Sequence, residues 1–358
     1  QSYYFIKIDN INHKTTQNSG LSLEEIISIP STEINNVYSF KERLFYEKDL
    51  YNLVSTGQQW FGEYFGSLNQ LSIQLDAVGS NLNDSIYFRA RVAARSSIVS
   101  KFEFKLMPNL NSFCEISIPP EISDDYYYEV TEEEFFLPNI NLNNWGGNII
   151  VNYQNNGNPS ALSWLDFIEI NFNKNLQYFN GNQLVFRSFA ENESDLDIFY
   201  LPNETNLVFD VTDPFNMTKI QIFDSNDNNN LIFGMNLQNL SEFIAIKDNS
   251  YLEPMFIEEI SNQNLHSLSP ADLIIVAHND FISQANRLAD FHQAINNIDV
   301  VIASVDQVYN EFSGGSQDPV AIRDFVRMLY NKASSEEELP KNLLLFGDAS
   351  FDYKNITD

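Results

Sequence analysis

Three short apolar runs near the C-terminal end of the chain constrain its fold most strongly. Two amphipathic helical patterns separate the runs, which are Asp272-Leu-Ile-Ile-Val-Ala-His278, Asp299-Val-Val-Ile-Ala-Ser304 and Asn342-Leu-Leu-Leu-Phe-Gly-Asp348. Apolar strands spaced by helices are typical of a parallel sheet that is buried on both faces. A doubly wound domain rarely ends after three strands. We therefore predict that residues 271–358 are the first half of a parallel α/β domain.

Both helices between these strands have start signals. Asp280 can cap a helix over residues 281–295, and Asp318 followed by Pro319 is an N-cap with proline at the first helical position. The expected apolar faces are Phe281, Ala285, Leu288, Ala289 and Ile295 in the first helix and Ile322, Phe325, Val326 and Leu329 in the second.

Residues 67–250 have the period-two pattern of β-strands between turn-forming residues such as Asn155-Asn-Gly-Asn-Pro159. This pattern predicts a β-sandwich domain. The expected strands are 71–75, 85–93, 101–106, 113–118, 148–153, 164–170, 183–189, 206–210, 220–223 and 242–246.

The remaining segments are less regular. We predict a β-rich N-terminal segment over residues 1–66, with a strand at 3–8, a short helix or excursion at 41–48 and an aromatic turn at 57–66 that covers a sheet edge. The acidic run 124–134 is expected to be a loop or an edge strand that its charge keeps soluble. Residues 251–270, with Pro254 and Pro270, are the expected linker.

The charge of the chain bears on its partners. A net charge of −29 argues against binding to nucleic acid, which is itself a polyanion. We expect no cofactor, although an acidic surface could hold calcium, for example at Glu132-Glu-Glu134. No run of about 20 apolar residues is present, so no spanning helix is expected. The chain begins at Gln1 without a signal segment, as in a processed product or an internal fragment.

The single cysteine, Cys114, lies on the same strand face as Ile116 and Ile118, and we expect a buried structural thiol. In parallel sheets, functional sites form at the carboxyl ends of strands. Here these ends are His278 with Asn279 and Asp280, the region 304–306, and Gly347-Asp348. His278 could act as a base, while Asp348 could orient a histidine, cap a turn or bind a cation. No Walker, GxGxxG, GxSxG or HExxH motif is present.

Three segments resemble the start of the gingipain-type cysteine peptidase domain, a C25-like family: residues 269–278, 307–325 and 343–353. Upstream, Gln59-Trp-Phe-Gly-Glu-Tyr-Phe65, Tyr153-Gln-Asn-Asn-Gly-Asn-Pro-Ser160 and Trp164-Leu-Asp-Phe-Ile-Glu169 are similar to the sortases that serve type IX secretion in Bacteroidota. The resemblance thus spans most of the chain and implies a caspase-like α/β domain with a Cys–His dyad.

The resemblance also implies a surface-exposed enzyme associated with the outer membrane. Such sortases remove the C-terminal sorting domain of secreted cargo and attach the cargo to lipopolysaccharide, together with a PorV-type outer-membrane β-barrel and other attachment-complex proteins. The family's catalytic cysteine and histidine would lie beyond Asp358, so we assign no catalytic residue here. The full-length protein would be a cysteine endopeptidase and transpeptidase, and the present segment alone should be inactive. His278, Gly347 and Asp348 are then neighbours of a site.

Two other interpretations stay open. The chain could be a non-enzymatic surface or adhesion module, with a β-sandwich and a pseudo-enzyme α/β unit. It could also be a receiver-like α/β protein. A receiver needs paired acidic residues after its first strand, and His278-Asn-Asp280 supplies only one.

Overall fold

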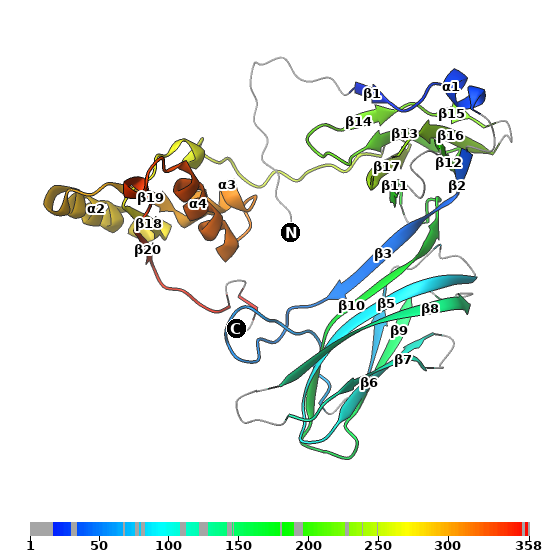
Figure 1. Cartoon of the computed structure of the whole chain (residues 1–358), viewed down its shortest axis with the longest axis horizontal. Coiled ribbons are helices and arrows are strands. Elements are labelled where there is room, and N and C mark those ends of the chain that lie inside the picture. Colours follow the sequence, from blue (N-terminus) through cyan, green and yellow to red (C-terminus); the bar gives the residue numbers. More distant parts are fainter. Residues whose placement is uncertain are drawn as a thin grey trace. The chain divides into compact units, whose positions relative to one another are not determined.

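A computed structural model shows a sheet-rich protein with a smaller α/β part (Figure 1). It divides into two compact units. One contains residues 55–59 and the chain from Met255 onward, and the other contains the remaining described residues. The structure describes residues 17–29, 34–66, 69–75, 79, 83–107, 112–121, 128–141, 145, 147–179, 181–189, 196–225, 229–237, 239–248, 250–352 and 355–356. The strand expected at residues 3–8 lies outside them.

Two four-stranded sheets form a first sandwich in the sheet-rich unit. One has the order β3-β10-β5-β8 and the other β4-β9-β6-β7. Alternate residues of both sheets, such as Phe88, Phe104 and Phe172, meet in one core without exposure to solvent. The strands are β3 (Ser39–Glu47), β4 (Gln70–Gln74), β5 (Asn83–Arg95), β6 (Ser100–Leu106), β7 (Ser112–Ile118), β8 (Glu129–Asn141), β9 (Asn148–Gln154) and β10 (Leu162–Asn175).

The same unit contains a second sandwich, whereas the sequence predicted only one. Its sheets have the orders β1-β14-β13-β17-β11 and β15-β16-β12-β2, and a cluster of phenylalanines that includes Phe199, Phe233 and Phe243 fills the core. Helix α1 (Leu23–Ser28) packs Ile26 on the outer face of β12. The strands are β1 (Gln17–Ser19), β2 (Ile34–Val37), β11 (Gln183–Ser188), β12 (Leu196–Pro202), β13 (Thr205–Asp210), β14 (Thr218–Ile220), β15 (Phe223–Asp224), β16 (Asn230–Met235) and β17 (Ser241–Lys247).

The expected border at residue 66 does not coincide with a border between structural units. Strands β1 and β2 run parallel to β14 and β12, and β3 pairs with β10. The short helix or excursion expected at 41–48 was wrong, since this segment is most of β3. Its exposed residues Lys41, Arg43, Phe45 and Glu47 alternate with less exposed ones, of which Leu44 and Tyr46 pack on the core of the first sandwich.

Two other expectations in the sheet-rich unit are confirmed. Within the segment 57–66, Phe61 packs in a cluster with Ala93 and Trp164, and Tyr64 forms an isolated bridge to Trp164. The described part of the acidic run belongs to β8, which is the edge strand of its sheet. The run expected at 220–223 is divided between β14 and β15, and β12 and β16 were not foreseen.

The α/β unit has a three-stranded parallel sheet with the order β19-β18-β20. Its elements are β18 (Leu273–Ala277), α2 (Ile282–Asn296), β19 (Val300–Ser304), α3 (Val305–Phe312), α4 (Pro319–Lys332) and β20 (Asn342–Phe346), with short 3₁₀ helices at Leu265–Ser267, Asn279–Phe281 and Glu336–Glu338. All five residues of β18 are buried. Ile275 faces α2 and Ile274 faces α3 and α4, so helices cover both faces of this strand (Figure 1).

The signal for the second helix is confirmed, whereas Asp280 does not cap α2, whose N-cap is Phe281 without a side-chain hydrogen bond. Ala285, Leu288 and Ala289 of α2 pack on the sheet as expected, but Phe281 and Ile295 are exposed. Asp318 Oδ1 accepts a hydrogen bond of 2.8 Å from the backbone N–H of Val320, and Pro319 is the first residue of α4. Helix α3 was not foreseen as a separate helix. Residues 251–264 contain no helix or strand, whereas Leu265 is buried in the core beside α3 and α4. The α/β unit therefore includes the last residues of the expected linker.

Candidate functional site

The order of the parallel strands defines the candidate site. The connection from β18 leads to β19 on one side, and the chain then returns to place β20 on the other side of β18. Where successive connections diverge in this way, the carboxyl ends of the two neighbouring strands form a crevice that commonly binds ligands. Here the two strands are β18 and β20, which end next to His278 and Gly347.

His278 and Gly347 lie side by side at this edge. The backbone N–H of His278 donates a hydrogen bond of 3.1 Å to the carbonyl oxygen of Phe346, which continues the pairing of the two strands. A Cβ atom on Gly347 would lie 3.6 Å from the Cβ of His278, an ordinary contact. Gly347 does not have a positive φ, so the backbone conformation at this position does not require glycine.

The imidazole of His278 is held through one of its nitrogens. Nδ1 accepts a hydrogen bond of 3.3 Å from the backbone N–H of Asp280 and lies 3.6 Å from the Oδ2 of the same residue. The ring also lies 5.9 Å from the ring of Phe281. Within the described residues, Nε2 makes no hydrogen bond. The exposed ring can therefore offer Nε2 to a group that approaches this edge.

The neighbouring strand ends are also connected. The side-chain amide of Asn279 donates a hydrogen bond to the carboxylate of Asp306, which lies in the first turn of α3. This helix begins with a capping box, in which Ser304 and Gln307 each accept from the backbone of the other. The bond thus ties the end of β18 to the helix that follows β19. The sequence placed both residues at strand ends but gave no sign that they meet.

Asp348 has a local role in the structure. Its Oδ1 accepts a hydrogen bond of 3.0 Å from the backbone N–H of Ala349. Of the three roles considered for Asp348, this contact corresponds to the capping of a turn. No hydrogen bond or ion pair joins it to His278 in the part of the chain that the structure describes. The edge therefore offers the imidazole of His278 beside Gly347, with the hydrogen-bonded carboxylates of Asp306 and Asp348 nearby, but the described residues bring no cysteine to it.

Cys114 lies in the other compact unit, in strand β7, where it is buried as expected. Burial raises the pKa of its thiol, and the nearby carboxylate of Glu115 adds to the increase. The thiolate is the nucleophilic form of cysteine, so a thiol with a raised pKa is poorly reactive.

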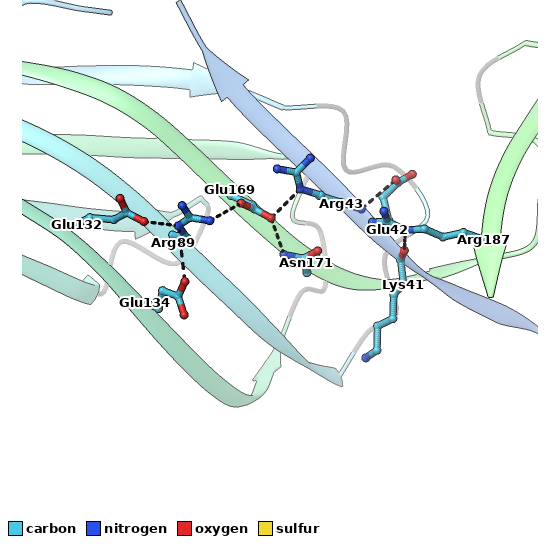
Figure 2. Close-up of polar contacts among 9 residues, drawn as sticks. All are labelled: Lys41, Glu42, Arg43, Arg89, Glu132, Glu134, Glu169, Asn171 and Arg187. Atoms are coloured by element: carbon cyan, nitrogen blue, oxygen red, sulfur yellow. Dashed lines mark hydrogen bonds and ion pairs between the residues drawn. The ribbon is translucent and has the colours of Figure 1, made fainter. Parts of the chain in front are cut away.

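A second polar cluster lies on the sheet β3-β10-β5-β8 (Figure 2). Arg89 lies 2.6 Å from Glu132 and 3.6 Å from Glu134, so two of the acids considered for calcium are paired with a guanidinium. Arg89 also reaches Glu169, which accepts a hydrogen bond from Arg43. Among the described residues, no group of three or more His, Cys, Asp or Glu side chains could hold a metal ion.

The sequence of the α/β unit matches a known peptidase family. Residues 266–357 match the sequence model of peptidase family C25. The matched range begins within the 3₁₀ turn at Leu265–Ser267 and contains the whole three-stranded sheet with its carboxyl edge. The sequence of the α/β unit is therefore similar to peptidase family C25, in agreement with the gingipain-type resemblance.

The protein as a whole is PorU-like in fold. Its structure is similar to the crystal structure of dimeric latent PorU from Porphyromonas gingivalis, with a TM-score of 0.69 and 19% sequence identity over 89% of this chain. The chain spans 31% of that PorU chain, about a third of its length.

Other solved structures align much more weakly. The coat protein of Tobacco streak virus aligns with a TM-score of 0.21 and 9% identity over 39% of this chain and 90% of its own, and the carbohydrate-binding module CBM36 with a TM-score of 0.18 and 13% identity over 33% and 97%. Neither likeness supports an argument. The comparison with curated proteins gave no match. None of the described helices has the length and apolar character needed to cross a membrane.

Proposed function

We propose that this chain is part of a PorU-like cell-surface cysteine peptidase and transpeptidase. The full-length protein would remove the C-terminal sorting domain from type IX secretion cargo and attach the cargo to lipopolysaccharide. The proposal rests on the agreement between the sequence match to family C25 and the structural match to PorU. The sheet β19-β18-β20 lies wholly within the C25 match, and the PorU fold extends over 89% of the chain.

In this proposal the α/β unit supplies the leading strands of the peptidase domain. Peptide-bond cleavage by a cysteine enzyme needs a thiolate, a base and a surface that orients the substrate. The carboxyl edge with His278 and Gly347 would form one wall beside a Cys–His dyad that residues outside this chain supply. The proposed location is the cell surface in association with the outer membrane, with the PorV-type protein and other attachment-complex proteins as partners.

Removal of the full-length protein from the cells that make it tests the proposal. Cells without it should accumulate cargo that keeps its C-terminal sorting domain and carries no lipopolysaccharide, as read by mass spectrometry and gel mobility. A gene copy for the full-length protein should restore both modifications. Cargo that is cleaved and modified normally without the protein would overturn the proposal, and loss of surface adhesion alone would favour the adhesion module.

A variant of Cys114 tests whether this cysteine, and not one outside this chain, is the nucleophile. A Cys114→Ala copy should restore cargo processing fully, since the buried thiol of Cys114 is expected to take no part in the chemistry. If this copy leaves cargo unprocessed while the protein reaches normal abundance, the assignment of the nucleophile to residues beyond Asp358 is wrong.

A further inference from the structure

The second sandwich carries a surface hollow of about 660 Å³ that the peptidase proposal does not use. Ligand pockets for small molecules commonly measure about 300–1,000 Å³. Four segments line the hollow: Tyr38 between β2 and β3, the residues 175–178 at and after the end of β10, the end of β12 with the turn that follows it (Tyr200, Pro202, Asn203 and Glu204), and Asn229–Asn230 at the start of β16. All four lie in the sheet-rich unit.

Two stacked tyrosines, together with Tyr178, form the aromatic part of the hollow. The rings of Tyr38 and Tyr200 lie 4.4 Å apart between centroids, with an angle of 23° between their planes. Tyr38 keeps 56% of its surface exposed, so a ligand can reach its ring from solvent. The hydroxyl of Tyr200 donates a hydrogen bond of 3.1 Å to Asn36, which fixes this ring. The pair thus offers a flat apolar surface to solvent.

Amide side chains supply most of the polar lining. Asn175, Gln177, Asn203 and Asn229 come from three different segments, and each amide carries both a donor and an acceptor. The carboxylate in the lining is Glu204, which lies 3.6 Å from the ammonium of Lys247. The lining is therefore nearly neutral and can both donate and accept hydrogen bonds.

The walls of the hollow are held by backbone and side-chain bonds. The N–H of Leu176 donates to the carbonyl of Tyr38 at 2.9 Å, which ties the segment after β10 to the first tyrosine. The hydroxyls of Tyr178 and Thr205 lie 3.0 Å apart, and Pro202 pairs with Asn230 between β12 and β16. A site whose walls are already ordered loses less entropy when it binds a ligand.

We propose that this hollow binds a neutral oligosaccharide. The CH face of a sugar ring is apolar and fits an exposed tyrosine, while its hydroxyls need partners that donate and accept, as amides do. A polyanion such as nucleic acid would meet no Lys or Arg side chain among the described residues that line the hollow, on a chain of net charge −29. A purely apolar ligand would leave the amides unpaired. The inference is independent of the peptidase chemistry.

The test uses the whole 358-residue chain and a printed array of neutral oligosaccharides: α- and β-glucans, mannans, galactans, xylans and rhamnans. The strongest binder on the array is then titrated by calorimetry against the parent chain and two variants. Tyr38→Ala removes the exposed ring of the hollow. Tyr87→Ala is the matched control, because Tyr87 is 57% exposed in β5 of the first sandwich and lies outside the hollow.

We expect Tyr38→Ala to weaken binding about tenfold or more, which corresponds to roughly 1.4 kcal/mol, whereas Tyr87→Ala leaves the affinity unchanged. A melting temperature for Tyr38→Ala within a few degrees of the parent would show that the loss is local. If no oligosaccharide on the array binds the parent chain, or if Tyr38→Ala binds as tightly as the parent, the proposal is overturned. Neither result bears on cargo processing, so failure here and failure of the peptidase proposal are distinguishable.

Discussion

The Nε atom of Arg43 donates a hydrogen bond of 2.7 Å to Oε1 of Glu169, a residue 126 positions further along the chain. The other oxygen of the same carboxylate lies 3.4 Å from a guanidinium nitrogen of Arg89 (Figure 2). Each guanidinium also lies over an aromatic ring, Arg43 over Phe45 and Arg89 over Phe167. The carboxylate is almost fully covered and thus joins three strands of one sheet.

Replacement of this carboxylate should destabilise the first sandwich. Glu169→Gln should lower the free energy of unfolding by about 1–3 kcal/mol at pH 7, because the partly covered guanidinium of Arg43 loses its charged partner and that of Arg89 loses one of three. Urea denaturation provides the measurement. Glu115→Gln is the control, since its 2.9 Å contact with Lys101 is more exposed and should contribute about 0–1 kcal/mol. Equal losses for both variants would contradict this prediction.

The same pair should respond to acid. The hydrogen bond from Arg43 holds the pKa of Glu169 below its usual value of 4.5, although burial opposes the change. A group with a lowered folded pKa stabilises the protein above its unfolded pKa, and this contribution disappears as the pH falls through the folded value. The difference in stability between the parent and Glu169→Gln should therefore be full at pH 6 and shrink below about 4.5. A difference that is constant from pH 7 to pH 3 would show that charge is not the cause.

Asp166 should show the opposite dependence. Burial raises its pKa to about 6, despite Arg91 at 3.4 Å, and the carboxylates of Glu47, Asp49 and Glu132 add to the increase. Because the folded state holds the proton more tightly than an unfolded Asp, stability falls as the pH rises from about 4 to 6. Asp166→Asn should remove a loss on the order of 2 kcal/mol over this interval. Urea midpoints at pH 4 and pH 7 measure it, and parallel pH profiles for the parent and the variant would contradict it.

Two glycines should differ in their tolerance of a methyl group. A Cβ on Gly347 meets only the Cβ of His278 at 3.6 Å, so Gly347→Ala should change stability by less than about 0.5 kcal/mol. Gly57 has a φ of +73° and its Cβ would lie 2.6 Å from the carbonyl oxygen of Phe351. Gly57→Ala should therefore cost more than about 1 kcal/mol. Thermal unfolding of the two variants compares them directly, and a larger loss at Gly347 would show that this position is strained.

Cys114 should resist alkylation while the protein is folded. Burial raises the pKa of its thiol, so little thiolate forms near neutral pH and the reagent cannot reach the sulfur. Iodoacetamide at pH 8 should leave the native chain unmodified and modify it completely in concentrated urea, as measured by intact mass. Rapid modification without urea would mean that strand β7 opens readily.

The sequence predicted the α/β unit better than the sheet-rich unit, because its signals are local. An N-cap with proline, such as Asp318-Pro319, and a buried run such as Leu273–Ala277 can be read within a few residues. Strand β3 was misread because its charges find their partners on β10, more than 100 residues away. A charged segment with no visible partner has the composition of a surface helix.

The candidate site could be predicted only in part, for the same reason. That His278 and Gly347 end parallel strands follows from the sequence, but their adjacency depends on the strand order β19-β18-β20. The sequence does not say that β20 returns to the first strand instead of the second. The sequence did not predict the hollow of the second sandwich. Its tyrosines Tyr38 and Tyr200 come together because β2 pairs in parallel with β12.

That pairing has a consequence for the order in which the chain can fold. Strand β1 pairs with β14 and β2 with β12, each as parallel neighbours separated by well over 100 residues. A ribosome or a secretion channel that releases the chain from its N-terminus delivers β1 and β2 long before their partners. Pairings of such high contact order form slowly. The second sandwich can therefore close around β1 and β2 only after β12 and β14 have been released, and a chain interrupted before Leu196 would leave both early strands unpaired and open to aggregation.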